Sequence, residues 1–186
     1  MTPRSGERRS GVWGTWLDYK YMQGVAERGG GVRVSYLDGR IEIMTLSLEH
    51  EARKRSLSSC LDAWLSQKNI DFFAHGSATL ESEVREAGKE PDDSYCFHQQ
   101  KQHPDLVIEI AITTGGVETL ELYRRWQIPE VWIWHRNRLH VFHLEGGDYV
   151  AAEASRWFPD LDMALLVECV KLDNTNEARR RFLAGR

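Results

Sequence analysis

One short segment, HPDLVIEIAI at 103–112, limits most strongly what this chain can fold into. Six of its last seven residues are apolar, and most of these are β-branched. A run of this kind is typical of a central strand that is covered on both faces. Glu109 lies in the middle of the run, and burying a carboxylate without a partner is costly. The segment therefore predicts a layered domain with a glutamate that protonates, meets a cation or binds a metal.

The composition is that of an ordinary globular protein. The chain has 186 residues, of which 41% are hydrophobic and 28% are charged, enough for one domain with a substantial core. No stretch approaches the roughly 20 apolar residues of a membrane span, so no membrane partner is expected. The basic N-terminus lacks the apolar segment of a secretory signal.

Cysteine usage and net charge bear on location and partners. Cys60, Cys96 and Cys169 are widely spaced and odd in number, which predicts a reducing, cytoplasmic compartment rather than a disulfide framework. The net charge of −4 does not itself indicate a nucleic-acid-binding protein, although it leaves room for a local basic patch.

The pattern along the chain predicts a loose arm at 1–11, one domain at 12–172 and a basic tail with a short surface helix at 173–186. Apolar stripes predict helices at 12–28, 47–69 and 117–128, the second with Ser47 as N-cap. Strands or hairpins are predicted at 32–44, 72–82, 91–97, 103–112 and 130–144. Asp38-Gly39 marks the turn of the first hairpin. Two long helices around a mixed sheet indicate an α/β or α+β domain.

Two acids are expected to share one space. Asp92 lies 17 positions before Glu109, near the start of the preceding strand-like run. If the two strands are neighbours, both carboxylates can hold Mg²⁺, which prefers oxygen ligands and keeps several waters. The alternative is that Asp92 caps a turn and Glu109 pairs with an arginine such as Arg33 or Arg40.

Several motifs together resemble a known family. EPDDSY at 90–95, PDLVIEIAITTGG at 104–116 and LELYRRWQIPEVWIW at 120–134 are similar to the restriction endonuclease family of the Uma-two type, within the PD-(D/E)XK nuclease superfamily. YLDGRIEIM, SLEHE and PDLDMALL extend the likeness over nearly the whole chain after residue 12. The resemblance implies a restriction-endonuclease-like mixed β-sheet flanked by helices, with an N-terminal hairpin, and a Mg²⁺- or Mn²⁺-dependent endonuclease that acts on DNA.

The resemblance also assigns roles to residues. It implies a metal held by Asp92, Glu109 and Ile110. Glu49, at the start of a core helix, would bind the ion through water or orient the nucleophile, with His50 assisting. The same likeness places two further acids near the site: Glu42 and Asp105.

The chain departs from this family in its cationic partner. The superfamily places a lysine near the metal to position water and stabilise negative charge. The two expected positions hold Ala111 and Thr119 instead, and Thr119 is the inward position that corresponds to the family's helix lysine. The basic residues available as substitutes are Lys54, Lys89, Arg53 and Arg124, of which the arginines would be poor bases.

Three hypotheses follow. The first is a Mg²⁺-dependent DNA endonuclease, expected as a homodimer that leaves a 5′ phosphate. The second is a non-catalytic nucleic-acid-binding module, favoured by the missing lysine. The third is a structural or regulatory protein in which Glu109 is ion-paired.

Other motifs have simpler readings. A zinc site at Cys96, His98 and His103 lacks the usual spacing. The basic run at 53–55 either contacts phosphate or is a solvated helix face. TTGG at 113–116 is interpreted as a turn, because it lacks a phosphate-binding glycine pattern. Trp132 and Trp134 share a strand face and are expected to pack inward.

Overall fold

The apolar run forms the strand β8 (Leu106–Ala111), every residue of which is buried in the computed structural model of this protein. The structure describes residues 7–112 and 117–185. β8 pairs antiparallel with β7 (Asp93–Phe97) and parallel with β9 (Glu130–His135). The predicted central strand with cover on both faces is confirmed.

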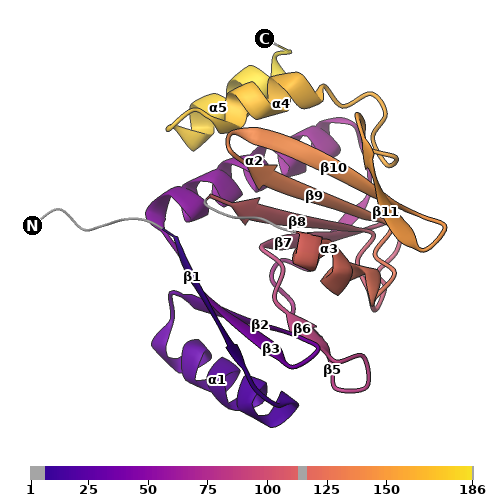
Figure 1. Ribbon diagram of the computed structural model, residues 1–186. Coiled ribbons are helices and arrows are strands. Elements are labelled where there is room, and N and C mark those ends of the chain that lie inside the picture. Colours follow the sequence, from indigo (N-terminus) through magenta and orange to yellow (C-terminus); the bar gives the residue numbers. More distant parts are fainter. Residues whose placement is uncertain (1–6, 113–116, 186) are drawn as a thin grey trace, which may run out of the picture.

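The strands of the described residues form two sheets (Figure 1). The six-stranded mixed sheet has the order β11 (Asp148–Ala152), β10 (Arg138–Glu145), β9, β8, β7 and β4 (Phe72–Ala74). The five-stranded antiparallel sheet has the order β1 (Arg8–Trp13), β3 (Arg40–Thr45), β2 (Val32–Leu37), β6 (Ala87–Lys89) and β5 (Leu80–Ser82).

Helices cover both sheets. α2 (Leu48–Gln67), α4 (Met163–Val170) and α5 (Thr175–Leu183) pack against one face of the six-stranded sheet. α3 (Val117–Arg124), β5 and β6 lie against its other face. α1 (Trp16–Gly29) packs on the five-stranded sheet. The mixed α and β architecture agrees with the sequence prediction.

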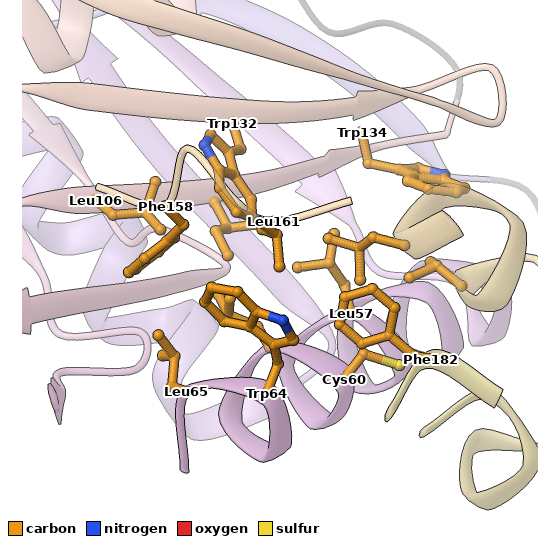
Figure 2. Packing of buried hydrophobic residues seen from close by; sticks show 14 of the residues in the cluster. Leu57, Cys60, Trp64, Leu65, Leu106, Trp132, Trp134, Phe158, Leu161 and Phe182 are labelled. Carbon is orange, nitrogen blue, oxygen red and sulfur yellow. The ribbon is translucent and has the colours of Figure 1, made fainter. Parts of the chain in front are cut away.

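Side-chain alternation along β8 assigns its residues to two separate cores. Leu106, Ile108 and Ile110 pack toward α2, whereas Val107 and Ala111 pack toward α3. Glu109 therefore lies on the α3 side. On the α2 side, Figure 2 shows Trp132 and Trp134 of β9 above residues of α2; both are fully buried, as predicted.

The N-terminal segment differs from the expected loose arm. Residues 1–6 lie outside the described residues, but Arg8–Trp13 form β1 and pair with β3 along its length. The first helix begins at Trp16 rather than at residue 12, because Thr15 caps it and Asp18 completes a capping box. The strand was missed because five of its six residues are exposed and show no alternation.

The turn of the first hairpin is confirmed. Asp38 and Gly39 have φ values of 47° and 81°, the left-handed pair that a two-residue turn requires.

The C-terminal segment, in contrast, is not a solvated tail. α5 packs against α2 and α4 through Ala178 and Phe182, which are buried in the main core. None of the described helices is long and apolar enough to cross a bilayer.

Candidate functional site

Five polar side chains meet beside the C-terminal half of β8. Asp92 immediately precedes β7, and Glu109 comes from β8 itself. His50 enters from the first turn of α2, Lys89 from the end of β6 and Tyr123 from α3. All five residues are buried. Side chains from three further elements thus surround the carboxylates of Asp92 and Glu109, which were predicted to converge.

Asp92 is held as a carboxylate. Its Oδ2 accepts a hydrogen bond of 2.7 Å from the Ile110 main-chain N–H and lies 3.1 Å from His50 Nε2. Burial alone would raise the pKa of Asp92, but His50, the Ile110 N–H and the charge of Lys89 outweigh it and lower the pKa. The side chain therefore presents a negative charge in a fixed orientation.

Glu109 has two direct partners. Lys89 Nζ lies 3.2 Å from Glu109 Oε2, and the Tyr123 hydroxyl donates a hydrogen bond to Oε1. Burial raises the pKa of Glu109, the charge of Lys89 opposes this, and the negative charge of Asp92 raises the pKa further. The neighbouring cation is thus a lysine rather than an arginine of the kind expected; Arg33, one of those named, pairs with Glu90.

The start of α2 brings one of two predicted residues to the site. Ser47 caps the helix as expected, accepting from the His50 N–H at 3.1 Å. This register buries His50 and leaves Glu49 exposed. Burial alone would lower the pKa of His50, but its contacts with Asp92 and the half-exposed Glu51 raise it. His50 therefore contacts Asp92 directly, whereas Glu49 is exposed on the surface of the helix.

The two positions without lysine lie on β8 and α3, the elements that carry Glu109 and Tyr123. Ala111 is two residues after Glu109 and packs in the core on the same side of the sheet. Thr119 is partly buried and lies one helical turn before Tyr123 on α3. No sequence pattern indicated the hydrogen bond from Tyr123 to Glu109.

The basic residues considered as substitutes are placed differently. Arg53 donates a 2.9 Å hydrogen bond to the Val170 carbonyl and so ties α2 to α4. Arg124 pairs with Glu121 on its own helix at 2.7 Å. Lys54 is partly buried on α2 and makes no ion pair within the described residues. Of these candidates, Lys89 alone contacts an acid of the site.

The two further acids that the resemblance placed near the site form ion pairs with other residues. Glu42 lies 3.0 Å from Arg9 of β1. Asp105, at the opposite end of β8, pairs with Lys101 at 2.7 Å. The residue before β1 contributes a further group: the buried carboxylate of Glu7 accepts a hydrogen bond from the Ile112 N–H at 3.3 Å. No sequence pattern indicated this contact, since it joins residues 105 positions apart.

The oxygen ligands at this site suit Mg²⁺, and they are too few for a site in which protein groups alone surround the ion. Asp92 and Glu109 supply carboxylate oxygens, and the effect of one charge on the pKa of the other places them in one electrostatic neighbourhood. Ile110 can offer only its carbonyl oxygen, because its N–H is bonded to Asp92. No group of three or more His, Cys, Asp or Glu within the described ranges could hold an ion. A pair completed by water is what Mg²⁺ commonly accepts.

The same observation removes the zinc interpretation for the described residues. Cys96 Sγ lies 3.5 Å from His75 Nε2 and near main-chain carbonyls, rather than in a cluster with His98 and His103. The TTGG segment at 113–116 lies outside the described residues.

Comparison with known proteins gives a family and a fold. A family model described as "Uma2: Putative restriction endonuclease" matches residues 16–173. A crystal structure of "a putative nuclease belonging to DUF820" from Anabaena variabilis ATCC 29413 superposes with a TM-score of 0.50 at 12% identity. The superposition covers 80% of this chain and 90% of that one. No curated protein matches the sequence.

Proposed function

Since the chain belongs to the Uma2 family of restriction-endonuclease-like proteins, we propose that it is a Mg²⁺-dependent endonuclease that hydrolyses phosphodiester bonds in DNA. The family and the nuclease-like fold support a nuclease. The observation that carries the finer proposal is the convergence of Asp92, which immediately precedes β7, and Glu109, from within the adjacent strand β8. Mn²⁺, with the same preference for oxygen, is the expected alternative ion.

The chain's own residues would divide the work as follows. Asp92, Glu109 and the Ile110 carbonyl would hold the ion. His50 and the Ile110 N–H keep Asp92 ionised and oriented. Tyr123 fixes Glu109 by its hydrogen bond. When bound, Mg²⁺ would lower the pKa of a water molecule and offset charge on the phosphate.

Glu49 keeps only a peripheral role in this proposal. Its side chain is exposed in the first turn of α2, one residue before His50. From there it can reach the ion or the attacking nucleophile through water and not directly. Thr119 contributes no charge. It stands at the position where the family carries its helix lysine.

The test is nicking of supercoiled plasmid in Mg²⁺ and in Mn²⁺ by wild type, Glu109→Ala and Thr119→Lys. The proposal expects cleavage by wild type and its loss in Glu109→Ala. Glu153→Ala, which removes an exposed carboxylate, is the matched control and should cleave like wild type. Cleavage that survives in Glu109→Ala would contradict the proposal that Glu109 belongs to the active site.

A nucleic-acid-binding module without catalysis is the second candidate, and the absence of lysine at Ala111 and Thr119 favours it. It predicts DNA binding, measured by fluorescence anisotropy, without nicking by wild type. The third reading, in which the Lys89–Glu109 ion pair is purely structural, predicts no heat of Mn²⁺ binding in calorimetry. An endonuclease predicts Mn²⁺ binding that Asp92→Asn abolishes.

The proposal includes a homodimer in a reducing compartment such as the cytoplasm. Leu17, Tyr21 and Val25 follow one another at four-residue spacing on α1 and remain exposed, as does Trp13 at the end of β1. Beside them an apolar groove of about 330 Å³ lies between α1 and β2. Contiguous exposed apolar surface of this kind marks interaction sites. The three cysteines are buried and free, which suits a reducing environment.

Sedimentation of wild type and Tyr21→Glu tests the dimer. We expect wild type to sediment as a dimer and the variant as a monomer, because the new charge would be desolvated in the interface. Val84→Glu, at a fully exposed position outside this face, is the control. A monomeric wild type would exclude the dimer.

A further inference from the structure

We infer that Lys89, presented by the second sheet, is the catalytic cation that replaces the lysine missing at positions 111 and 119. The inference rests on the proposed nuclease function and names the group that stabilises negative charge on the scissile phosphate. It also removes the main argument for an inactive site.

The placement of Lys89 is the first support. Its side chain is only 9% exposed, and its Nζ lies 3.2 Å from Glu109 Oε2. Its charge also contributes to lowering the pKa of Asp92, so the ammonium acts on both acids. A lysine in the superfamily's usual position would occupy the same neighbourhood, because Ala111 lies two residues along the same strand face as Glu109.

The backbone fixes this placement. β6 pairs with β2 and β5, so Lys89 lies opposite Leu80 in a short antiparallel ladder. Gly88 allows the close packing of Tyr19, since a Cβ at Gly88 would lie 2.5 Å from the Tyr19 hydroxyl oxygen. The lysine is thus held from behind by α1 while its ammonium faces the acids of the other sheet.

The remaining lysines are engaged elsewhere or make no contact with the site. Four of them contact residues away from the acid pair: Lys20 with Glu81, Lys68 with Trp64, Lys101 with Asp105, and Lys171 with Glu168. Lys54 makes no ion pair with a described residue. Arg9, whose pKa the charge of Glu109 helps to raise, has its guanidinium bonded to Glu7 and Glu42.

In this reaction Lys89 acts only as a fixed positive charge beside the scissile phosphate. Water attacks phosphorus and forms a P–O bond, and the bond from phosphorus to the 3′ oxygen breaks. The attacking water gives up one proton to solvent and the 3′ oxygen takes one, leaving a 5′ phosphate and a 3′ hydroxyl. Negative charge grows on the phosphate oxygens during this step, and a fixed ammonium in a buried site stabilises it.

The experiment relocates the lysine. Cleavage of an oligonucleotide duplex is measured for wild type, Lys89→Met, Thr119→Lys, Lys89→Met/Thr119→Lys and the control Lys54→Met. Mn²⁺ affinity by calorimetry and thermal unfolding are measured on the same proteins. Methionine reaches as far as the lysine Cε but lacks the ammonium group, so it keeps the apolar packing of the side chain, and we expect folding and ion binding to survive.

We expect Lys89→Met to lower kcat by about 100-fold or more, the usual effect of removing a group that stabilises transition-state charge. Mn²⁺ affinity should change by only a few-fold, and Lys54→Met should match wild type. The second-site Thr119→Lys should restore a measurable part of kcat, since Thr119 lies one turn from Tyr123.

Three results would overturn the inference. Full activity in Lys89→Met would show that the ammonium is not needed. Loss of both Mn²⁺ binding and cleavage in Lys89→Met would show that Lys89 is needed for the structure of the site rather than for catalysis. Activity in Thr119→Lys alone, with a silent wild type, would show that Lys89 does not replace the missing lysine. Silence of every variant would instead reject the nuclease function itself, and the inference with it.

Discussion

At the scale of single residues, the glutamate in the apolar strand is explained by its partners. Glu109 is buried, yet Lys89 and Tyr123 bond its two oxygens. A buried ion pair of this kind contributes little net stability, because desolvation offsets the attraction. Its persistence in a strand otherwise suited to packing is therefore better explained by function than by stability.

The His50–Asp92 contact makes stability depend on pH. The pKa of folded His50 is raised above its ordinary value of 6.5, so the stability it contributes is fully present below about pH 6.5. That contribution is lost as the pH rises through the raised pKa. Asp92 stays ionised over this range because its own pKa is lowered.

We therefore expect His50→Gln to lose stability at about pH 6 and to approach wild type at about pH 9, as followed by urea unfolding. His140→Gln, which changes an exposed histidine, is the control. An equal difference between wild type and His50→Gln at both pH values would show that the contact is not a charged one.

At the scale of elements, two sheets contribute to one site. Glu109 lies on β8 and Asp92 immediately precedes β7, both in the six-stranded sheet, whereas Lys89 comes from β6 of the other sheet. β6 has only three residues, so its position depends on what packs against it. Tyr19 of α1 packs so close to Gly88 that an added Cβ would lie 2.5 Å from the Tyr19 hydroxyl oxygen.

Gly88→Ala should destabilise the protein by about 1–3 kcal/mol, the usual effect of overpacking, and displace Lys89 from Glu109. Gly24→Ala on α1 is the control, since its Cβ would meet only Arg28 Nη1 at 3.6 Å. Alanine is the better helix former, so the control should be neutral or slightly stabilised. Chemical denaturation together with the nicking assay would measure both effects. A stable, fully active Gly88→Ala would contradict the tight packing.

At the scale of the whole molecule, the C-terminal helix belongs to the core. Phe182 is 4% exposed and packs in the same cluster as α2 and the large sheet. Phe182→Ala should therefore lower the free energy of unfolding by about 3–5 kcal/mol. Arg180→Ala, on the exposed side of α5, should change it by no more than about 0.5 kcal/mol. Equal unfolding free energies for the two variants would mean that residues 173–186 form a detachable tail.

Much of the architecture follows from local patterns. The strand at 106–111, the helix capped by Ser47 and the hairpin at Asp38-Gly39 are each encoded within a few neighbouring residues. Periodicity and turn chemistry act over such short distances, which is why these elements were predicted. β1 and β6 were not, since an exposed strand and a three-residue strand carry little periodicity.

The sequence alone determined that the carboxylate of Glu109 lies in a buried strand and that Asp92 is the acid expected beside it. Burial cost and strand alternation, on which both predictions rest, are local properties. Only the tertiary structure decided that His50 rather than Glu49 faces them, and that Lys89 and Tyr123 hold Glu109. These contacts join residues 42, 20 and 14 positions apart, across two sheets and two helices. The pairing of strands and the packing of helices depend on long-range contacts that no local pattern encodes.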